Sequence, residues 1–282
     1  MELLTHAGRF RPARKTIGEA AYYVGVVAIC LPFVFVFYWM VLGGLKTQVQ
    51  NTASPPLFLF RPTLENFRKV FVANQFPKYI QNSIAVSGGA TLVALALGLP
   101  AAHAIARYRR KGVALGILVA RMAPHLSYVV PFFILFQKLG WIDTYACMIL
   151  SHLVITLPIV VWIMIGAFED VPLELEEAAR IDGCSRWRVF TRISLPVCRT
   201  ALATATILSF IFSWNNFIFA LILTGPERRT LPVAVFNFIS GDEIDWGGLS
   251  AAATVITLPI LLLILFVQRH IVQGMTAGGL KE

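Results

Sequence analysis

The feature that most limits how this chain can fold is a series of six apolar runs, each long enough to cross a membrane. Crossing roughly 30 Å of hydrocarbon takes about 20 apolar residues in a helix. Hydrophobic residues make up 57% of the sequence and charged residues only 14%, which is far from the composition of a soluble domain. The sequence therefore predicts an all-α polytopic membrane protein with six transmembrane helices, at about 20–42, 83–106, 113–136, 144–168, 201–223 and 249–268.

The basic residues predict the orientation of these spans. Six spans place both ends of the chain on one side of the membrane. If that side is the cytoplasm, fifteen of the 24 Lys and Arg residues lie in the inner segments 1–19, 107–112, 169–200 and 269–282, and eight lie in the outer ones. Cytoplasmic loops carry such an excess, so we expect cytoplasmic termini, with a six-span domain over 20–268 between a short N-terminal segment and a C-terminal tail. The net charge of +9 then reflects membrane topology and not nucleic acid binding.

Proline and small residues predict how the spans pack. Prolines lie well inside five of the six runs, so kinked helices are expected. The second run carries a small residue at every fourth position, which would let a neighbouring helix approach closely: Ala90, Ala94, Gly98, Ala102 and Ala106. Alanine is also common in membrane spans, so the spacing alone leaves an even choice between a packing face and composition.

Several functional classes lack their usual residues. All fifteen Asp and Glu residues fall in tails, loops or span edges, which disfavours an ion-coupled secondary carrier with a carboxylate at mid-membrane. The chain has no HExxH, GxSxG or GxxxxGK[ST] motif, and its four cysteines have no CxxC spacing, so neither an intramembrane enzyme nor a metal site is indicated. We therefore expect no catalytic residue and no metal ligand, and energy for uphill transport would come from another polypeptide.

The charged segment 169–200 between the fourth and fifth runs is built as two short helices. Pro172 and the acidic residues that follow it suit the start of a helix running to about residue 181. Asp182-Gly183 predicts its end, and Ser185 can cap a second helix that continues to Pro196. The small residues Ala178 and Ala179 would leave one surface low, and Glu177 could pair with an Arg across an interface. This segment is predicted to dock a partner.

Residues in this segment resemble a known family. Glu177-Ala178-Ala179, Gly183, Ile193 and Leu195-Pro196 have the spacing of the EAA signature in permease subunits of bacterial ATP-binding cassette (ABC) importers. Further matches resemble the carbohydrate branch, and the chain is similar throughout to the smaller maltose-type permease subunit: Arg121-Met122-x-Pro124, Leu139-Gly140-x-x-Asp143-Thr144, Trp214-Asn215-x-Phe217 and the tail from Gln268 to Lys281. Cys184, where the family often has Ala, is a mild departure.

The resemblance implies a type I importer permease in the bacterial inner membrane. Its implied partners are a second permease subunit, two ATPase subunits that bind ATP and Mg²⁺, and an extracytoplasmic solute-binding protein; this chain itself would bind no cofactor. The coupling residues carried over from the family lie in the two-helix segment: Glu177, Ala178, Ala179, Asp182, Gly183 and Arg186. The tail of similar subunits lies along the ATPase dimer interface, which assigns the same place to Gly274, Thr276, Gly278, Gly279 and Lys281.

Six polar or aromatic residues within the spans are candidates for the substrate path. Arg121 is charged within the third run, and it either faces the path or serves as an ion pair or a cap for a carbonyl freed by Pro124. His125 and His152 either contact substrate or are hydrogen-bonded packing residues. The fifth run supplies an aromatic face and two amides that suit a sugar, Trp214, Asn215 and Asn216, although Asn215 could instead link helices. The outer loop 225–248 is expected to contact either the binding protein or the partner permease.

Overall fold

The computed structural model describes residues 14–240 and 243–278. Four of its helices are long and apolar enough to cross a membrane by themselves: α1 (Arg14–Gly44), α4 (Phe76–Arg107), α7 (Tyr145–Glu169) and α14 (Trp246–Gly278). The number rises to six if each of two bent pairs is one span: α5 (Lys111–Met122) with α6 (His125–Lys138), and the stretch α9 (Arg186–Val189), η2 (Phe190–Ser194) and α10 (Leu195–Val197) with α11 (Arg199–Trp214). The all-α polytopic fold expected from the sequence is confirmed.

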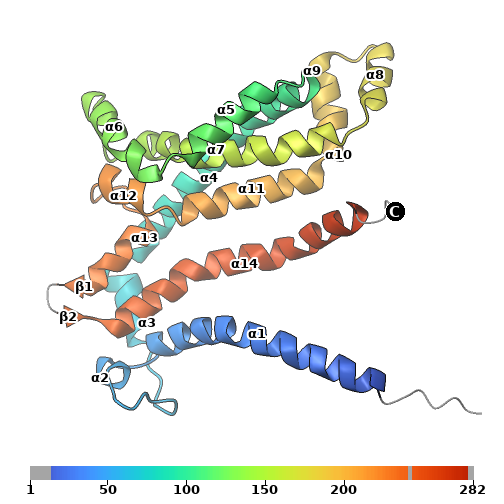
Figure 1. Cartoon of the computed structure of the whole chain (residues 1–282). Coiled ribbons are helices and arrows are strands. Elements are labelled where there is room, and N and C mark those ends of the chain that lie inside the picture. The colour runs from blue at the N-terminus through green and yellow to red at the C-terminus, as the bar shows by residue number, and fades with distance from the viewer. Residues whose placement is uncertain (1–13, 241–242, 279–282) are drawn as a thin grey trace, which may run out of the picture.

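Short elements join these helices (Figure 1). Before α4 come α2 (Gln48–Asn51), α3 (Glu65–Arg68) and the π-helix η1 (Lys69–Ala73), and after α7 comes α8 (Leu173–Ile181). Between α11 and α14 lie α12 (Ile218–Leu223), α13 (Leu231–Ala234), the 3₁₀-helix η3 (Val235–Phe238) and the antiparallel strands β1 (Ile239–Ser240) and β2 (Glu243–Ile244).

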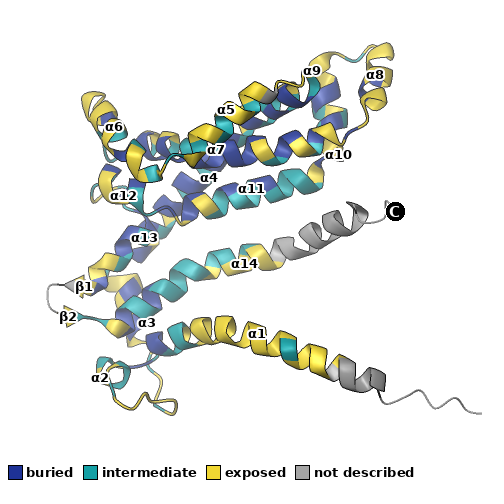
Figure 2. Cartoon of the chain, viewed as in Figure 1, coloured by how far each residue is buried: buried dark blue, intermediate teal, exposed yellow. Residues whose placement is uncertain are grey.

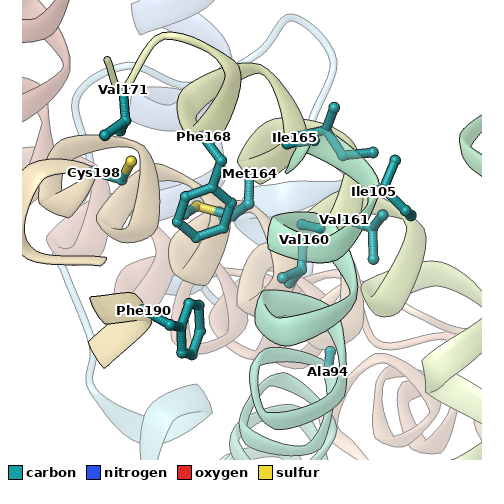
Figure 3. Close-up of a cluster of buried hydrophobic side chains, with 13 residues drawn as sticks. Ala94, Ile105, Val160, Val161, Met164, Ile165, Phe168, Val171, Phe190 and Cys198 are labelled. Atoms are coloured by element: carbon teal, nitrogen blue, oxygen red, sulfur yellow. The ribbon is translucent and has the colours of Figure 1, made fainter. Parts of the chain in front are cut away.

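The centre of the bundle is the pair α4 and α7, with α11 packed against both. The small residues at every fourth position of α4 are all buried, and a Cβ placed on Gly98 would lie 2.8 Å from Cγ1 of Val160 on α7. The predicted packing face is therefore confirmed: the missing side-chain atoms are what bring α4 and α7 together. Figure 3 shows the apolar cluster that fills the inner part of this bundle, with Ala94 and Ile105 from α4, Val160 to Phe168 from α7 and Phe190 from η2.

Helices α1 and α14 form a second pair, joined most closely at the ends that lie near α2 and the β1–β2 hairpin. A Cβ on Gly44 would lie 3.2 Å from Cα of Ala251, and Asn66 Nδ2 donates hydrogen bonds to the carbonyls of Gly44 at 2.9 Å and Lys46 at 2.7 Å. Trp214 Nε1 donates to the Ile256 carbonyl at 3.2 Å and links α11 to α14. The apolar surface of α1 is exposed along most of its described length (Figure 2), and the residues that the structure describes do not cover it.

The third apolar run, expected as one span over 113–136, is broken into α5 and α6, which meet at 88°. Pro124 lies at the break and cannot donate the backbone hydrogen bond that would continue the helix. The hydroxyl of Tyr128 donates to the Ala120 carbonyl at 2.6 Å and satisfies the acceptor that the proline leaves free. The kink was predictable from the proline; its size was not.

The fifth run, expected as one span over 201–223, also divides. α11 ends at Trp214, and the chain turns through Asn215, Asn216 and Phe217 before α12 begins at Ile218. The amide oxygen of Asn216 accepts a hydrogen bond from the Phe219 N–H at 3.1 Å, so Asn216, one residue before the N-cap Phe217, satisfies a donor in the first turn of α12. Asn is a favoured capping residue, and this local bond competes successfully with continuation of the helix.

The two ends of the molecule differ in character (Figure 1). α8, α9 and the described ends of α1 and α14 lie at one end, and α2, α6, α12 and the β1–β2 hairpin lie at the other. The two described chain ends and the charged segment 169–200 are therefore on one side, as a six-span topology requires.

Candidate functional site

The charged segment between α7 and α11 is an elbow formed by two helices and a glycine. α8 begins after Pro172, with Glu174 and Glu176 in its first turn, where the positive end of the helix dipole stabilises their negative charges. Gly183 follows α8 with φ +85°, a left-handed conformation that glycine adopts without strain. The Gly183 N–H donates to the Arg180 carbonyl at 3.1 Å and the Cys184 N–H to the Ala179 carbonyl at 3.0 Å, which is the Schellman pattern of helix ends.

The second arm of the elbow begins at Ser185. Its hydroxyl accepts a hydrogen bond from the Arg188 N–H at 3.3 Å and caps α9. The helix then widens into the π-helix η2, which ends two residues before Pro196, a residue that has no N–H to donate. The stop at Asp182-Gly183 and the Ser185 cap agree with the sequence prediction.

The predicted coupling residues divide between two faces of the elbow. Glu177, Ala178, Asp182, Gly183 and Arg186 are exposed, as a docking surface requires. Ala179 is only 7% exposed and faces inward, so the expectation that both alanines lower one outer surface is wrong for Ala179. Ile181, 87% exposed beside Asp182, is an apolar side chain on the outer face.

Glu176, one residue before Glu177, has a different environment. Its Oε1 accepts hydrogen bonds from Arg107 on α4, at 2.9 Å from Nε and 2.6 Å from Nη2, and from the Ser194 hydroxyl on η2 at 2.6 Å. His103 Nε2 on α4 lies 3.2 Å from the same oxygen. We call these four residues the Glu176 cluster. It joins α8, α4 and η2 through one carboxylate oxygen.

Burial and charge act against each other at Glu176, whose side chain is 4% exposed. Burial alone would raise the pKa of the carboxyl group. The hydrogen bonds from Arg107, Ser194 and His103 and the positive charge of Arg107 outweigh burial and lower the Glu176 pKa from its usual 4.5 to about 2. Glu176 is therefore a carboxylate at any physiological pH, and its charge is matched by Arg107.

A cavity of about 380 Å³ lies beside the Glu176 cluster, between α4, α8 and α9. Its wall combines basic, aromatic and aliphatic side chains: Pro100, His103, Ala104, Arg107, Tyr108, Leu173, Glu176, Arg180, Arg186, Trp187, Val189 and Phe190. A second bridge between α4 and the elbow runs from Arg186 Nη1 to the hydroxyl of Tyr108, the residue after α4, at 3.0 Å. The elbow is thus connected to α4 and to Tyr108 by side-chain hydrogen bonds that lie beside this cavity.

Sequence reasoning overlooked the roles of Glu176, Arg107, His103 and Ser194. A signal for Glu176 was present, because it lies three residues before the small residue Ala179, and both are on the inward face of α8. A carboxylate on a buried face needs a cation, and Arg107 at the end of the second run was available. No sequence pattern indicated that Ser194 would be the third partner.

The predicted ATPase-interface tail is described only in part. Gly274, Thr276 and Gly278 belong to the last turns of α14, which continues as a helix through the start of the predicted tail at residue 269. Gly279 and Lys281 lie outside the described residues.

The structure separates the six substrate-path candidates. Trp214 is 2% exposed and packs toward α14, so its ring is not available to a solute in this structure. Asn216 is buried and accepts a hydrogen bond from the first turn of α12, whereas Asn215 is exposed and donates only to the Ile211 carbonyl of its own helix at 3.0 Å. Of the aromatic and amide trio, Asn215 alone remains accessible.

His125 and His152 both lie near one aromatic ring, with centroid distances of 6.4 Å and 6.0 Å to Phe219. His152 is 1% exposed and its Nδ1 is 2.6 Å from the Ser213 hydroxyl, which fits a hydrogen-bonded packing residue. His125 is half-buried.

Arg121 forms no salt bridge with any acidic residue in the described part of the chain. Its guanidinium carbon lies 5.9 Å from the Phe212 ring centroid. Because Tyr128 occupies the carbonyl freed by Pro124, both structural roles considered for Arg121, ion pair and cap, are unsupported among these residues.

At the opposite end, the outer loop after α12 is fastened to α4 and to the start of α7. Asn82 Nδ2 donates to the carbonyls of Glu227 at 3.0 Å and Arg229 at 2.9 Å, and Asp143 Oδ1 accepts from the Arg228 N–H at 2.9 Å. Beyond this fixed base, the loop presents exposed apolar side chains, Phe236, Ile239 and Trp246.

Comparisons with known proteins agree with this arrangement. A probable ABC transporter permease protein, y4oR of Sinorhizobium fredii, is 37% identical over 251 residues, covering 88% of this chain and 91% of that protein. The trehalose/maltose transport system permease protein MalG of Thermococcus litoralis is 36% identical over 266 residues, covering 92% and 95%.

Among solved structures, a chain of a bacterial ABC transporter involved in the import of the acidic polysaccharide alginate superposes with a TM-score of 0.74 at 20% identity. The superposition covers 93% of this chain and 98% of that one, and it shows a common fold. The sequence profile for inner membrane components of binding-protein-dependent transport systems matches residues 94–277. The chain is therefore a multi-pass membrane protein that belongs to this family of inner membrane components, the permease subunits of ABC transporters.

Proposed function

We propose that this chain forms half of the translocation pathway of an ATP-driven importer for a sugar, a polyol or a glycoside. The observation that carries the proposal is the elbow at α8 and α9, whose exposed outer face holds Glu177 and Gly183 at the EAA spacing in a chain of this family. The substrate class rests on relatives whose names specify trehalose, maltose and diacetylchitobiose.

The proposed complex contains a second permease subunit, two ATPase subunits and an extracytoplasmic solute-binding protein. The exposed apolar side chains of α1 and α5 offer a surface for a second permease or for lipid. This chain has no proposed catalytic role, and ATP with Mg²⁺ would be bound and hydrolysed by the ATPase subunits. The elbow end would face the cytoplasm, in agreement with the excess of Lys and Arg in the inner segments.

In this proposal the elbow receives motion from the ATPase. Closure of the ATPase dimer on ATP would displace α8, and the carboxylate of Glu177 would pair with a basic side chain of the ATPase. Because the elbow lies between α7 and α11 in the chain, its displacement would change the relation of these two helices and alternate the exposure of the pathway.

The pathway side chains proposed here are Asn215, His125 and Arg121. Asn215 is accessible at the break between α11 and α12, and its amide suits hydroxyl groups. The exposed outer loop residues Phe236, Ile239 and Trp246 are proposed to contact the binding protein.

The proposal is tested by expressing the chain with its neighbouring transport genes and purifying the assembly through a tag on this subunit. We expect two ATPase subunits and a second permease to copurify, and ATP hydrolysis to rise when the liganded binding protein is added. Glu177→Lys should abolish that rise while the chain remains inserted. Leu175→Lys, a charge placed on an exposed residue of the same helix, serves as the control for position. Uptake into liposomes by the purified chain alone, without ATP, would contradict the proposal.

A further inference from the structure

We propose that the Glu176 cluster is the joint through which displacement of the elbow reaches α4, with Glu176 and Arg107 as its positioning residues. The inference rests on the proposed function, because it concerns how a force on α8 enters the membrane-spanning bundle. It assigns the transmitting contact to Glu176, on the inward face of α8, and leaves the exposed Glu177 to face the partner.

The first argument is geometric. One carboxylate oxygen receives both Arg107 nitrogens and the Ser194 hydroxyl within 2.9 Å, so α8, α4 and η2 are fixed relative to one another at a single point. Arg107 Nη2 also donates to the carbonyl of Val171 at 3.2 Å, in the short connection between α7 and α8. The side chain of one residue at the end of α4 therefore holds both the coupling helix and its connection to α7.

The second argument comes from the cavity. The space of about 380 Å³ between α4, α8 and α9 means that these elements do not press on one another through a continuous apolar core. Apolar contact near the cluster comes from Phe168 and Phe190, whose ring centroids each lie 5.1 Å from that of His103. Both phenylalanines belong to the bundle core shown in Figure 3 and not to α8. The hydrogen-bonded ion pair between Glu176 and Arg107 connects α8 directly to α4.

The third argument is the position of α4 in the bundle. α4 packs along α7 through its row of small residues and also contacts α11. Close-packed helices transmit displacement because interiors have low compressibility. A displacement delivered to Arg107 therefore reaches the helix that lies against both neighbours.

The choice of an ion pair at this point has a physical reason. A buried ion pair is often no more stabilising than a well-packed apolar pair, because both charges lose hydration. Several short hydrogen bonds to one oxygen, however, fix direction as well as distance, whereas apolar surfaces can slide. A joint that carries force needs a contact of fixed distance and direction more than it needs a contact that stabilises the fold.

The first test uses the full chain in lipid nanodiscs and needs no partner. Amide hydrogen exchange is followed in the segment 173–183 for wild type, Glu176→Gln, Arg107→Gln and the double variant. Loss of the joint should speed exchange in this segment by about tenfold or more, since opening no longer breaks the cluster. The double variant should exchange no faster than the faster single variant, because the two residues act as one unit.

Glu174→Gln is the matched control, since Glu174 lies in the same first turn of α8 and is exposed. Its exchange should equal that of wild type. Unchanged exchange in Glu176→Gln, or additive effects in the double variant, would overturn the joint. This outcome is independent of whether an ATPase binds.

The second test asks whether the joint transmits motion. In the assembled complex, with the four cysteines replaced, spin labels are placed at Leu175 on α8 and at Leu97 on α4, both exposed. ATP with vanadate should leave the distance between these labels unchanged in wild type, because α8 and α4 move together, and should change it in Glu176→Gln. Glu176→Gln should retain basal ATP hydrolysis but lose its stimulation by the binding protein.

Two results distinguish failure of the proposed joint at Glu176 from failure of the proposed importer function. A change of the Leu175–Leu97 distance in wild type on ATP binding would refute transmission through Glu176 while leaving the importer function intact. Failure of any ATPase subunit to copurify would refute the function, while the exchange experiment would still decide whether the cluster fixes α8 to α4.

Discussion

Tyr128 donates its hydroxyl hydrogen bond to the Ala120 carbonyl at 2.6 Å, across the bend between α5 and α6. The proline at position 124 cannot serve this carbonyl, and an unsatisfied acceptor in a membrane is costly. The bend of 88° is therefore held by the side chain of Tyr128, which lies about one helical turn after Pro124 in the sequence.

Removing that hydroxyl should loosen the bend. Tyr128→Phe is expected to lower the free energy of unfolding by about 1 kcal/mol, the usual net value of one hydrogen bond. Thermal unfolding of the detergent-solubilised protein measures the change. Tyr38→Phe is the control, since Tyr38 makes no side-chain hydrogen bond among the described residues, and equal losses in both variants would argue against the role of Tyr128.

The close approach of α4 and α7 predicts that Gly98 does not tolerate a methyl group. Gly98→Ala would place Cβ 2.8 Å from Val160 Cγ1, and overpacking of this kind costs about 1–3 kcal/mol. Gly88→Ala, on the same helix with nothing within 4 Å, should be neutral or slightly stabilising. Thermal unfolding of both variants decides the matter, and the prediction fails if Gly98→Ala is as stable as Gly88→Ala.

The left-handed conformation of Gly183 predicts strain in any other residue. Gly183→Ala should destabilise the elbow by about 1 kcal/mol, although no atom lies within 4 Å of the new Cβ. Hydrogen exchange in the segment 173–189 should quicken. Gly166→Ala, in α7 with equally open surroundings and ordinary φ, separates the conformational effect from added bulk and should leave exchange there unaltered.

The low pKa of Glu176 predicts that the protein loses stability at acid pH as this carboxylate is protonated. The folded pKa is about 2 and the usual value is 4.5, so the stabilisation is complete above about pH 4.5 and is lost as pH falls toward 2. A shift of this size corresponds to roughly 3 kcal/mol. The stability difference between wild type and Glu176→Gln should be constant above pH 5 and shrink below it. A difference independent of pH down to 2 would contradict the assignment.

Because Asn215 is exposed and Asn216 is buried, replacing these neighbouring residues should have different effects on stability and on transport. Asn216→Ala should destabilise the chain by about 1 kcal/mol, because it removes the side-chain acceptor of the Phe219 N–H in the first turn of α12. Asn215→Ala should leave thermal stability nearly unchanged and reduce uptake by the assembled transporter in liposomes. Normal uptake in Asn215→Ala would return this residue to a purely local role.

The sequence predicts the parts of this molecule whose cause is local. Pro172 and Gly183 determine where α8 begins and ends, Ser185 determines where α9 begins, and the small residues of α4 determine where another helix can approach. The breaks in the third and fifth runs depend on which partner takes a freed backbone group, Tyr128 in one and Asn216 in the other. Hydrophobicity alone does not reveal these partners.

The Glu176 cluster illustrates what sequence alone leaves out. Glu176 and Glu177 are adjacent and chemically identical, yet one is buried beside Arg107 and the other is exposed. The difference arises from the rotation of α8 on the bundle, which brings together residues 69 positions apart. A one-residue change in that rotation would exchange their environments.

The exposed first helix has a consequence for how the protein responds to its surroundings. Its apolar stretch of 24 residues would measure about 36 Å along the axis, longer than roughly 30 Å of hydrocarbon. Its C-terminal end is held through Gly43, Gly44 and Asn66, so tilting about that anchor is one way to absorb the excess length. Bilayers of different thickness would therefore swing the free end of α1 sideways while the α4–α7 bundle keeps its shape.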